Sequence, residues 1–261
     1  MKYNFDVEKN TKACIQWIKD WFERTGGATA NAIIGLSGGK DSTIAAALCV
    51  QALGPERVIG VAMPSEGQGL NDADKIAEYL GIRFLNVPIS AICSSFHFAG
   101  APEQIEWSKQ TEQNVPPRVR MTMLYAIAQT FNGRPVNTCN LSEDYVGYAT
   151  LFGDSAGSFS PTSGFTVTEL YQIGDYLGLP YEWVHKTPDD GLPHSSPDEE
   201  KFGFTYKELD RYIREGIMPF GPCNNNREVL KMEKIQTMHF CNKFKTEIIQ
   251  IPHFEPEVYT E

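Results

Sequence analysis

Short apolar runs alternate with helix-length segments through the first part of this chain. The expected strands are residues 32–36, 57–63 and 82–87, and the expected helices are residues 10–24, 41–53 and 71–80. Gly54-Pro55 ends the second helix, and Asn71 or Asp72 is the expected N-cap of the third. Strands joined by helices in this way run parallel. The pattern predicts an α/β fold of three layers, in which a doubly wound, mainly parallel sheet is flanked by helices.

The second part of the chain continues this pattern less regularly. Residues 89–115 show little periodicity, and we expect a partly mobile connection there. Pro116-Pro117 introduces an apolar stripe that predicts a helix over residues 118–131. Further expected elements are a strand at 136–141, a last helix at 227–247, and two helices opened by capping boxes, Thr166 with Glu169 and Thr205 with Glu208.

Composition narrows the classes of function. The chain has 261 residues, which favours one domain, and its 33 acidic against 23 basic residues give a formal net charge of −10. This charge repels nucleic acid and anionic membranes, so neither is an expected partner. No apolar stretch approaches the roughly 20 residues that span a bilayer, and the N-terminus lacks a signal-peptide pattern, so we expect a cytoplasmic protein. The six cysteines lack C-x-x-C spacing and predict neither a zinc site nor a disulfide framework.

The string IIGLSGGKDST, residues 33–43, places a glycine turn between a strand and a helix. Such a turn lies at the carboxyl end of the strand, where ligands bind in open α/β sheets and where the helix offers unpaired N–H groups. Gly38 and Gly39 let the backbone approach phosphate oxygens closely, and the hydroxyls of Ser37, Ser42 and Thr43 can donate hydrogen bonds. The turn therefore predicts a phosphate site.

The spacing of this turn excludes two common phosphate loops. It matches neither G-x-x-x-x-G-K-[ST] nor the dinucleotide fingerprint G-x-G-x-x-G. Asp41 is informative, because a carboxylate beside phosphate is repelled unless a cation lies between them. Magnesium would fill that role.

The string SGGKDST in this context resembles the pyrophosphate loop (PP-loop) of ATP pyrophosphatases, which cleave ATP between its α and β phosphates and pass AMP to a substrate oxygen. Three later motifs occur in the right order: VPPRVRMTMLYA (residues 115–126), NTCNLSEDYVGYATLFGDSAGSFSP (137–161) and DEEKFGFTYKELDRYI (198–213). Together they resemble NAD synthetase over nearly the whole chain. The resemblance implies one ATP pyrophosphatase-type domain over residues 1–261 with a Rossmann-like, adenine nucleotide α-hydrolase-like fold.

The resemblance also implies a two-step reaction. The nicotinate carboxylate of deamido-NAD attacks the α phosphate of ATP, and ammonia then takes the acyl-adenylate to give NAD, AMP and pyrophosphate. The chain carries no added glutaminase domain, so free ammonia is the expected nitrogen donor. Mg²⁺ is the expected metal, and the family forms homodimers that build the dinucleotide site across the subunit interface.

Site residues follow from matching positions in the family. The resemblance assigns ATP binding to Gly35, Leu36, Ser37, Gly38, Gly39, Lys40, Asp41, Ser42, Thr43, Met63 and Thr138. It assigns Mg²⁺ to Asp41 and Glu143, and substrate binding to Arg118, Arg120, Asp154 and His239. Asp41, Glu143 and Asp154 are the candidate catalytic residues, Asp154 by orienting or deprotonating the nitrogen donor.

Five positions depart from the usual family pattern: Leu151, Ser158, Val167, Pro197 and Phe240. Most lie in the half of the site expected to hold deamido-NAD, and a lost charged hydrogen bond there costs on the order of 1–3 kcal/mol. Two alternatives therefore stay open: a related ligase that adenylates a different carboxylate or carbonyl compound, and a nucleotide-binding paralogue without catalysis. Residues 188–200 predict an exposed loop, which the resemblance makes a lid over ATP.

Overall fold

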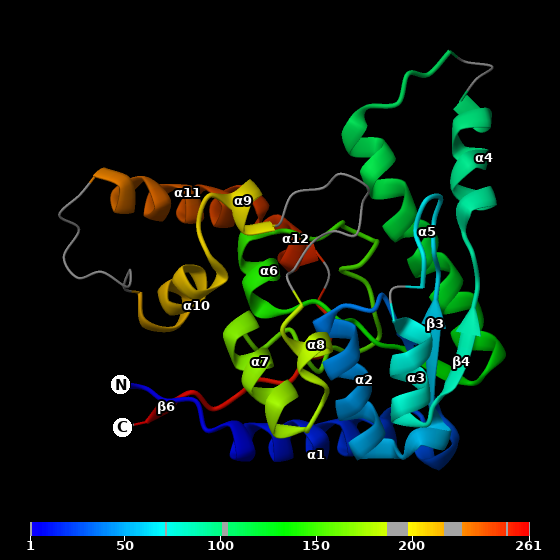
Figure 1. Ribbon diagram of the computed structural model, residues 1–261, viewed down its shortest axis with the longest axis horizontal. Helices are drawn as coiled ribbons and strands as arrows, with labels where there is room; N and C mark the ends of the chain where they lie inside the picture. Colours follow the sequence, from blue (N-terminus) through cyan, green and yellow to red (C-terminus); the bar gives the residue numbers. More distant parts are fainter. Residues whose placement is uncertain are drawn as a thin grey trace.

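The computed structural model describes residues 2–70, 72–100, 104–186, 198–216, 226–248 and 250–260. A four-stranded parallel sheet lies at the centre of the first part of the chain (Figure 1), with strand order β4-β3-β2-β5. Its strands are β2 (Asn31–Gly35), β3 (Val58–Ala62), β4 (Arg83–Asn86) and β5 (Gly133–Pro135). Ile33 is paired with Ile59 on one side and with Pro135 on the other. The predicted parallel α/β sheet is confirmed.

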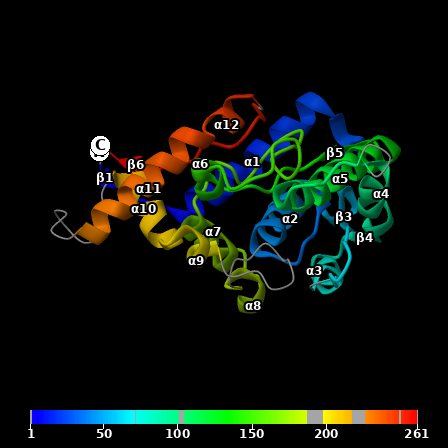
Figure 2. The same ribbon diagram turned by 90° about the horizontal axis from the view of Figure 1, so that it is seen from above.

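Helices cover both faces of this sheet. The helices of the first part are α1 (Val7–Thr25), α2 (Lys40–Leu53), α3 (Ala73–Leu80), α4 (Ser90–Gly100) and α5 (Lys109–Thr130). Side chains alternate along a strand. Ala32 and Ile34 accordingly join a core with α1, α2 and α3, whereas Ile33 joins a core with α5. The arrangement has the three predicted layers, helices, sheet and helices, and Figure 2 shows it from above.

The later helices form a second group, which meets α1 and α2 through residues 167–184. They are α6 (Leu141–Val146), α7 (Val167–Tyr176), α8 (Tyr181–Val184), α9 (Asp198–Phe202), α10 (Tyr206–Glu215), α11 (Asn226–Asn242) and α12 (Phe244–Ile248). The predicted capping boxes at Thr166 and Thr205 open α7 and α10. Strand β1 (Lys2–Tyr3) pairs antiparallel with β6 (Tyr259–Thr260), so the two ends of the chain lie side by side (Figure 1). No helix in the described part of the chain is long and apolar enough to cross a membrane.

The predicted strand at 136–141 is wrong. Strand β5 ends at Pro135, and Val136 makes only an isolated bridge to Phe159. The side chain of Asn137 accepts a hydrogen bond from the Cys139 backbone, and Asn140 caps α6. These local side-chain bonds to the backbone compete with a strand ladder, and they direct the chain into a helix instead.

The predicted connection at 89–115 is also wrong. Helix α4 occupies part of it, and α5 begins at Lys109, where the hydroxyl of the N-cap Ser108 accepts from the Thr111 N–H. Helix α5 thus contains Pro116 and Pro117, which lack the N–H of a helical hydrogen bond. Packing of α5 on the sheet outweighs this local cost.

Two predicted helix boundaries need smaller corrections. Helix α3 begins at Ala73 after Asp72, which occupies the N-cap position without a side-chain capping bond, and Asn71 lies outside the described residues. The structure has two helices, α11 and α12, where one helix was predicted at 227–247, and α11 ends at Asn242. The Asn242 amide donates to the carbonyls of Met238 and Val146, which ties that end of α11 to α6.

Candidate functional site

The glycine turn leads from the carboxyl end of β2 into α2. Gly38 has a φ of 78°, a left-handed conformation that favours glycine. The hydroxyl of Ser37 accepts from the Gly39 N–H at 3.2 Å and lies 3.2 Å from the hydroxyl of Ser42. Helix α2 has Gly39 at its N-cap, so no side chain caps it. Its first N–H groups are therefore disposed toward an anion.

Lys40 and Asp41 open α2 as a close ion pair. Lys40 is only 4% exposed, and its Nζ lies 2.8 Å from Oδ2 of Asp41. Burial lowers the pKa of Lys40, but the charges of Asp41 and Glu143 outweigh burial, and the net pKa is raised. Nζ also lies 5.7 Å from the ring centre of Tyr206 on α10. Lys40 is thus a cation held beside two carboxylates.

Glu143 reaches this place from α6. Burial raises the pKa of Glu143, the negative charge of Asp41 raises it further, and Lys40 opposes both. Glu143 is therefore close enough to Asp41 for the two charges to interact, as the sequence predicted. Two carboxylates beside a phosphate-binding turn fit the oxygen ligands that Mg²⁺ prefers, and phosphate oxygens and water would complete its shell.

Met63 and Thr138 follow the two strands that flank β2 in the sheet. Met63 follows β3 and is buried, and Thr138 follows β5 and is half-buried. Gly35 is enclosed on this side, because a Cβ there would lie 3.6 Å from Cε of Met63. Leu36 extends β2 by donating its N–H to the Val61 carbonyl at 2.9 Å.

Arg118, Arg120 and Asp154 gather where α5 meets the segment at 147–155. Arg120 donates from Nε to the Met63 carbonyl at 3.0 Å, and burial lowers its pKa while the charge of Asp154 opposes that shift. Arg118 is exposed, and its Nε donates to the Leu151 carbonyl at 3.3 Å. Asp154 accepts from the Thr150 N–H at 2.9 Å. The structure therefore brings these three predicted substrate residues into one region.

Comparison with known proteins decides the family. The family profile described as NAD synthase matches residues 10–248. The chain is 37% identical to the NH(3)-dependent NAD(+) synthetase of Methanocaldococcus jannaschii over 218 residues, covering 82% of this chain and 83% of that protein. The chain belongs to the NAD synthase family.

Further relatives and solved structures support membership of the NAD synthase family. The NH(3)-dependent NAD(+) synthetase of Carboxydothermus hydrogenoformans is 36% identical over 216 residues, 80% of this chain and 86% of that protein. The NMN synthetase of Francisella tularensis superposes with a TM-score of 0.82 at 28% identity, covering 96% of this chain and all of that one. The NH3-dependent NAD synthetase of Campylobacter jejuni, at 23% identity and a TM-score of 0.71 over 98% of this chain and all of that one, shows the same fold.

One predicted substrate residue of this NAD synthase family member has contacts elsewhere. His239 lies on α11, where Nδ1 is 2.8 Å from the Tyr145 carbonyl and the imidazole stacks on the Tyr145 ring at 4.0 Å between centroids. The contacts that the structure gives His239 connect α11 to α6, and none of them joins it to Arg118, Arg120 or Asp154. Its role in substrate binding remains a prediction.

Lys245 on α12 is a site neighbour that the sequence did not reveal. Its Nζ donates to the carbonyls of Gly147 at 2.7 Å and Ala149 at 3.0 Å. Burial lowers the pKa of Lys245, and the charge of Asp154 opposes that shift. No local pattern marks Lys245, because the segment that it holds lies nearly a hundred positions away in the chain.

The five departures from the family pattern have different surroundings. Val167 is buried in the core between α6, α7 and α10, and the Ser158 N–H is bonded to the Pro135 carbonyl. Phe240 is 84% exposed on α11, whereas Leu151 offers its carbonyl to Arg118. Pro197, with most of the predicted lid, lies outside the described residues.

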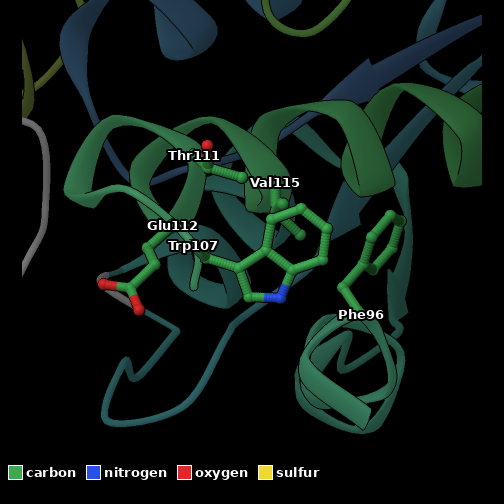
Figure 3. A pocket seen from close by; sticks show the side chains of 5 residues that line it. All are labelled: Phe96, Trp107, Thr111, Glu112 and Val115. Atoms are coloured by element: carbon green, nitrogen blue, oxygen red, sulfur yellow. The ribbon is translucent and has the colours of Figure 1, made fainter. Parts of the chain in front are cut away.

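A small cavity between α4 and α5 lies apart from these residues (Figure 3). It has a volume of about 30 Å³ and is lined by Phe96, Trp107, Thr111, Glu112 and Val115. That volume holds one water molecule rather than a nucleotide. The glycine turn, not this cavity, is therefore the candidate ATP site.

Proposed function

We propose that this protein carries out the reaction of its family, the ATP-dependent amidation of deamido-NAD by ammonia, giving NAD, AMP and pyrophosphate. The observation that carries the proposal is the meeting of Lys40 and Asp41 with Glu143 at the N-terminus of α2. Two carboxylates repel a bare phosphate anion, so their place beside the turn favours a nucleotide that is bound together with Mg²⁺, as ATP cleavage requires.

In the first step, the nicotinate carboxylate attacks the α phosphorus of ATP. An O–P bond forms, the bond between the α phosphorus and the bridging oxygen breaks, and pyrophosphate leaves into the glycine turn. The N–H groups at the start of α2 and the Nζ of Lys40 stabilise the charge that develops on the leaving oxygens. Asp41 and Glu143 would hold Mg²⁺, which supplies positive charge to the phosphate oxygens.

In the second step, ammonia attacks the acyl carbon of the adenylate, and AMP leaves with the bonding electron pair. The attacking nitrogen must lose a proton, and we assign that proton to the Asp154 carboxylate, held by the Thr150 N–H. Arg118 and Arg120 would pair with the phosphates or carboxylate of the substrate, for which a guanidinium group is suited.

The test is incubation of the purified protein with MgATP, ammonium and deamido-NAD, followed by mass spectrometry for AMP and NAD. We expect equal amounts of both, and far less of both from the Asp41→Asn variant. If AMP forms only with other carboxylates, the protein is a related ligase of different substrate. If no carboxylate yields AMP, it is a binding protein without this activity.

A mononucleotide substrate is the second candidate. The solved structure at a TM-score of 0.82 is an NMN synthetase, and the cationic positions usual in the family are replaced here by Leu151 and Phe240. A substrate with fewer phosphates needs fewer cations. The discriminating measurement is kcat/KM for nicotinate mononucleotide divided by kcat/KM for deamido-NAD. A ratio above 1 would identify the mononucleotide as the preferred substrate.

We also propose a homodimer, in line with the family. Helix α4 carries the exposed apolar side chains of Ile92, Phe96 and Phe98, which suit a protein interface. Light scattering should give twice the chain mass, and Phe98→Asp should reduce it. Tyr181→Asp, equally exposed on α8, is the control and should leave the dimer unchanged. The cytoplasmic location remains a prediction from the sequence.

A further inference from the structure

Asn140 is fully buried at the N-cap of α6, and its amide group is bonded at both ends. Oδ1 accepts from the Glu143 N–H at 3.0 Å, and Nδ2 donates to Oδ1 of Asp41 at 3.1 Å. A backbone N–H can only donate, so the amide oxygen must face Glu143 and the amide nitrogen must face Asp41. The orientation of the Asn140 side chain is thereby fixed.

The hydrogen bond from Asn140 connects Asp41 on α2 to helix α6. Oδ2 of Asp41 is paired with Lys40, the preceding residue on the same helix, so that contact does not connect α2 to α6. The Asn140 bond does connect them, because Asn140 caps the helix that carries Glu143. Each carboxylate oxygen has a second lone pair, which leaves both oxygens of Asp41 able to bind a cation.

Helix α6 has a separate anchor on its other side. The Ser142 hydroxyl donates to Oδ1 of Asp210 on α10 at 2.5 Å and accepts from the Val167 N–H at the start of α7 at 3.0 Å. These bonds hold α6 without help from the Nδ2 group of Asn140. Loss of the Asn140 to Asp41 bond should therefore free the Asp41 carboxylate and leave α6 in place.

We propose that Asn140 is a positioning residue that sets the orientation of Asp41 relative to Glu143 for a divalent cation bound with ATP. The inference rests on the proposed function for its biological meaning, but cation binding can be measured without turnover. The Asn140 amide does not itself need to touch the cation.

The test uses Asn140→Ser. Serine is a good N-cap and can still accept from the Glu143 N–H, but its side chain is too short to reach Asp41. A hydrogen bond to a charged group contributes about 1.5–3 kcal/mol, which corresponds to a weakening of cation binding by about tenfold to a hundredfold. Asn140→Thr is the second variant with the same logic, should the serine variant fold poorly.

Binding is measured with Mn²⁺ and α,β-methylene ATP, which cannot be cleaved between its α and β phosphates, from the electron paramagnetic resonance signal of free Mn²⁺. The matched control is Asn10→Ser. Asn10 is also buried, and its amide makes three hydrogen bonds, to the carbonyls of Asp6 and Glu257 and from the Glu257 N–H. We expect Asn10→Ser to lower the melting temperature and to leave Mn²⁺ binding unchanged.

The outcomes separate this inference from the proposed function. Folded Asn140→Ser with a Mn²⁺ dissociation constant within about twofold of wild type overturns the inference, as does equal weakening in Asn10→Ser. If the wild type binds Mn²⁺ with the nucleotide but forms no AMP, the proposed function fails, and the comparison of variants still decides the role of Asn140. Where turnover is present, Asn140→Ser should lower kcat and raise the Mg²⁺ requirement, with KM for the nicotinate substrate unchanged.

Discussion

Asp210 offers a sharp test of the electrostatics beside the site. It is 3% exposed on α10, where its carboxylate accepts from the Ser142 hydroxyl at 2.5 Å and from the Thr168 N–H at 2.8 Å. Burial raises the pKa of Asp210 to about 6 from the ordinary 3.8, although these hydrogen bonds oppose the rise. Asp210→Asn keeps the shape of the side chain and its acceptor for Thr168, and it removes the charge.

The sign of the effect follows from the raised pKa. A carboxyl whose pKa is higher in the folded protein stabilises the fold at low pH, and this contribution is lost as pH rises through the folded value. The difference of about 2 pKa units corresponds to about 3 kcal/mol, lost between about pH 4 and pH 7. The stability of Asp210→Asn relative to wild type should therefore increase by about 3 kcal/mol over this range. The Ser142 hydroxyl loses a charged acceptor in the variant only where wild-type Asp210 is ionised, and the folded pKa of Asp210 already includes the effect of that bond.

The assay is urea unfolding of both proteins at pH 4, 5, 6 and 7. Burial also raises the pKa of Asp144 to about 6, but Asp144 is present in both proteins and cancels in the difference. Asp20→Asn, exposed on α1, controls for the removal of one negative charge from the chain. A difference in unfolding free energy that stays flat, or that falls with pH, would refute the argument that Asp210 is held at an energetic cost.

Three further predictions concern the residues around α6 and α2. Gly147→Ala should destabilise the protein by about 2–4 kcal/mol in urea unfolding, because φ is +68° there and a Cβ would fall within 2.1 Å of the Asn242 Cβ. Lys40→Met leaves the carboxylates of Asp41 and Glu143 without their cation and should lower the free energy of unfolding by about 3–5 kcal/mol. Thermal unfolding should show a smaller loss at lower pH, because the raised pKa of Glu143 favours its neutral form. Asp41→Asn should lower AMP formation about a hundredfold or more in a MgATP assay, and an unchanged rate would remove Asp41 from the reaction.

The strands at the centre of the sheet could be predicted because each is buried on both faces. The side chains of β3, for example, enter two cores in alternation, with Val58 in one and Ile59 in the other. Such strands are continuous apolar runs. The capping boxes at Thr166 and Thr205 could be predicted for a different reason, since a capping box is a local bond pattern over four residues.

The apolar stripe predicted the helix over 118–131, which is most of α5, but the start of α5 and strand β5 could not be predicted from local pattern. Pro116 and Pro117 indicate a helix boundary by every local rule. Helix α5 nevertheless begins at Lys109, where Ser108 caps it, and Val115 packs against the core that contains Ile33. Strand β5 has three residues, glycine, arginine and proline, none of which favours a strand. Its place is set by pairing with β2, an interaction between segments about a hundred residues apart.

The same division between local and distant interactions separates the two halves of the candidate site. The ATP half contains one continuous turn, and Asp41 and Glu143 were expected near each other because parallel strands end at one edge of a sheet. Glu143 does lie near Asp41, but it comes from α6 and not from a strand tip, since β5 ends at Pro135. Asn140 lies within the strand that was predicted at 136–141, so neither its N-cap role nor its bond to Asp41 was predicted.

The substrate half is assembled from α5, the segment at 147–155 and α12, and its holding contacts are mostly to backbone carbonyls. Lys245 binds two carbonyls, Arg120 binds the carbonyl of Met63, and Arg118 binds that of Leu151. A carbonyl acceptor is the same whatever the side chain, so the side chain at 151 can differ without loss of the contact with Arg118. The contacts that hold this region can thus persist while the charge of its side chains differs. For this reason the comparison of mononucleotide with dinucleotide, rather than any further comparison of fold, will decide the substrate.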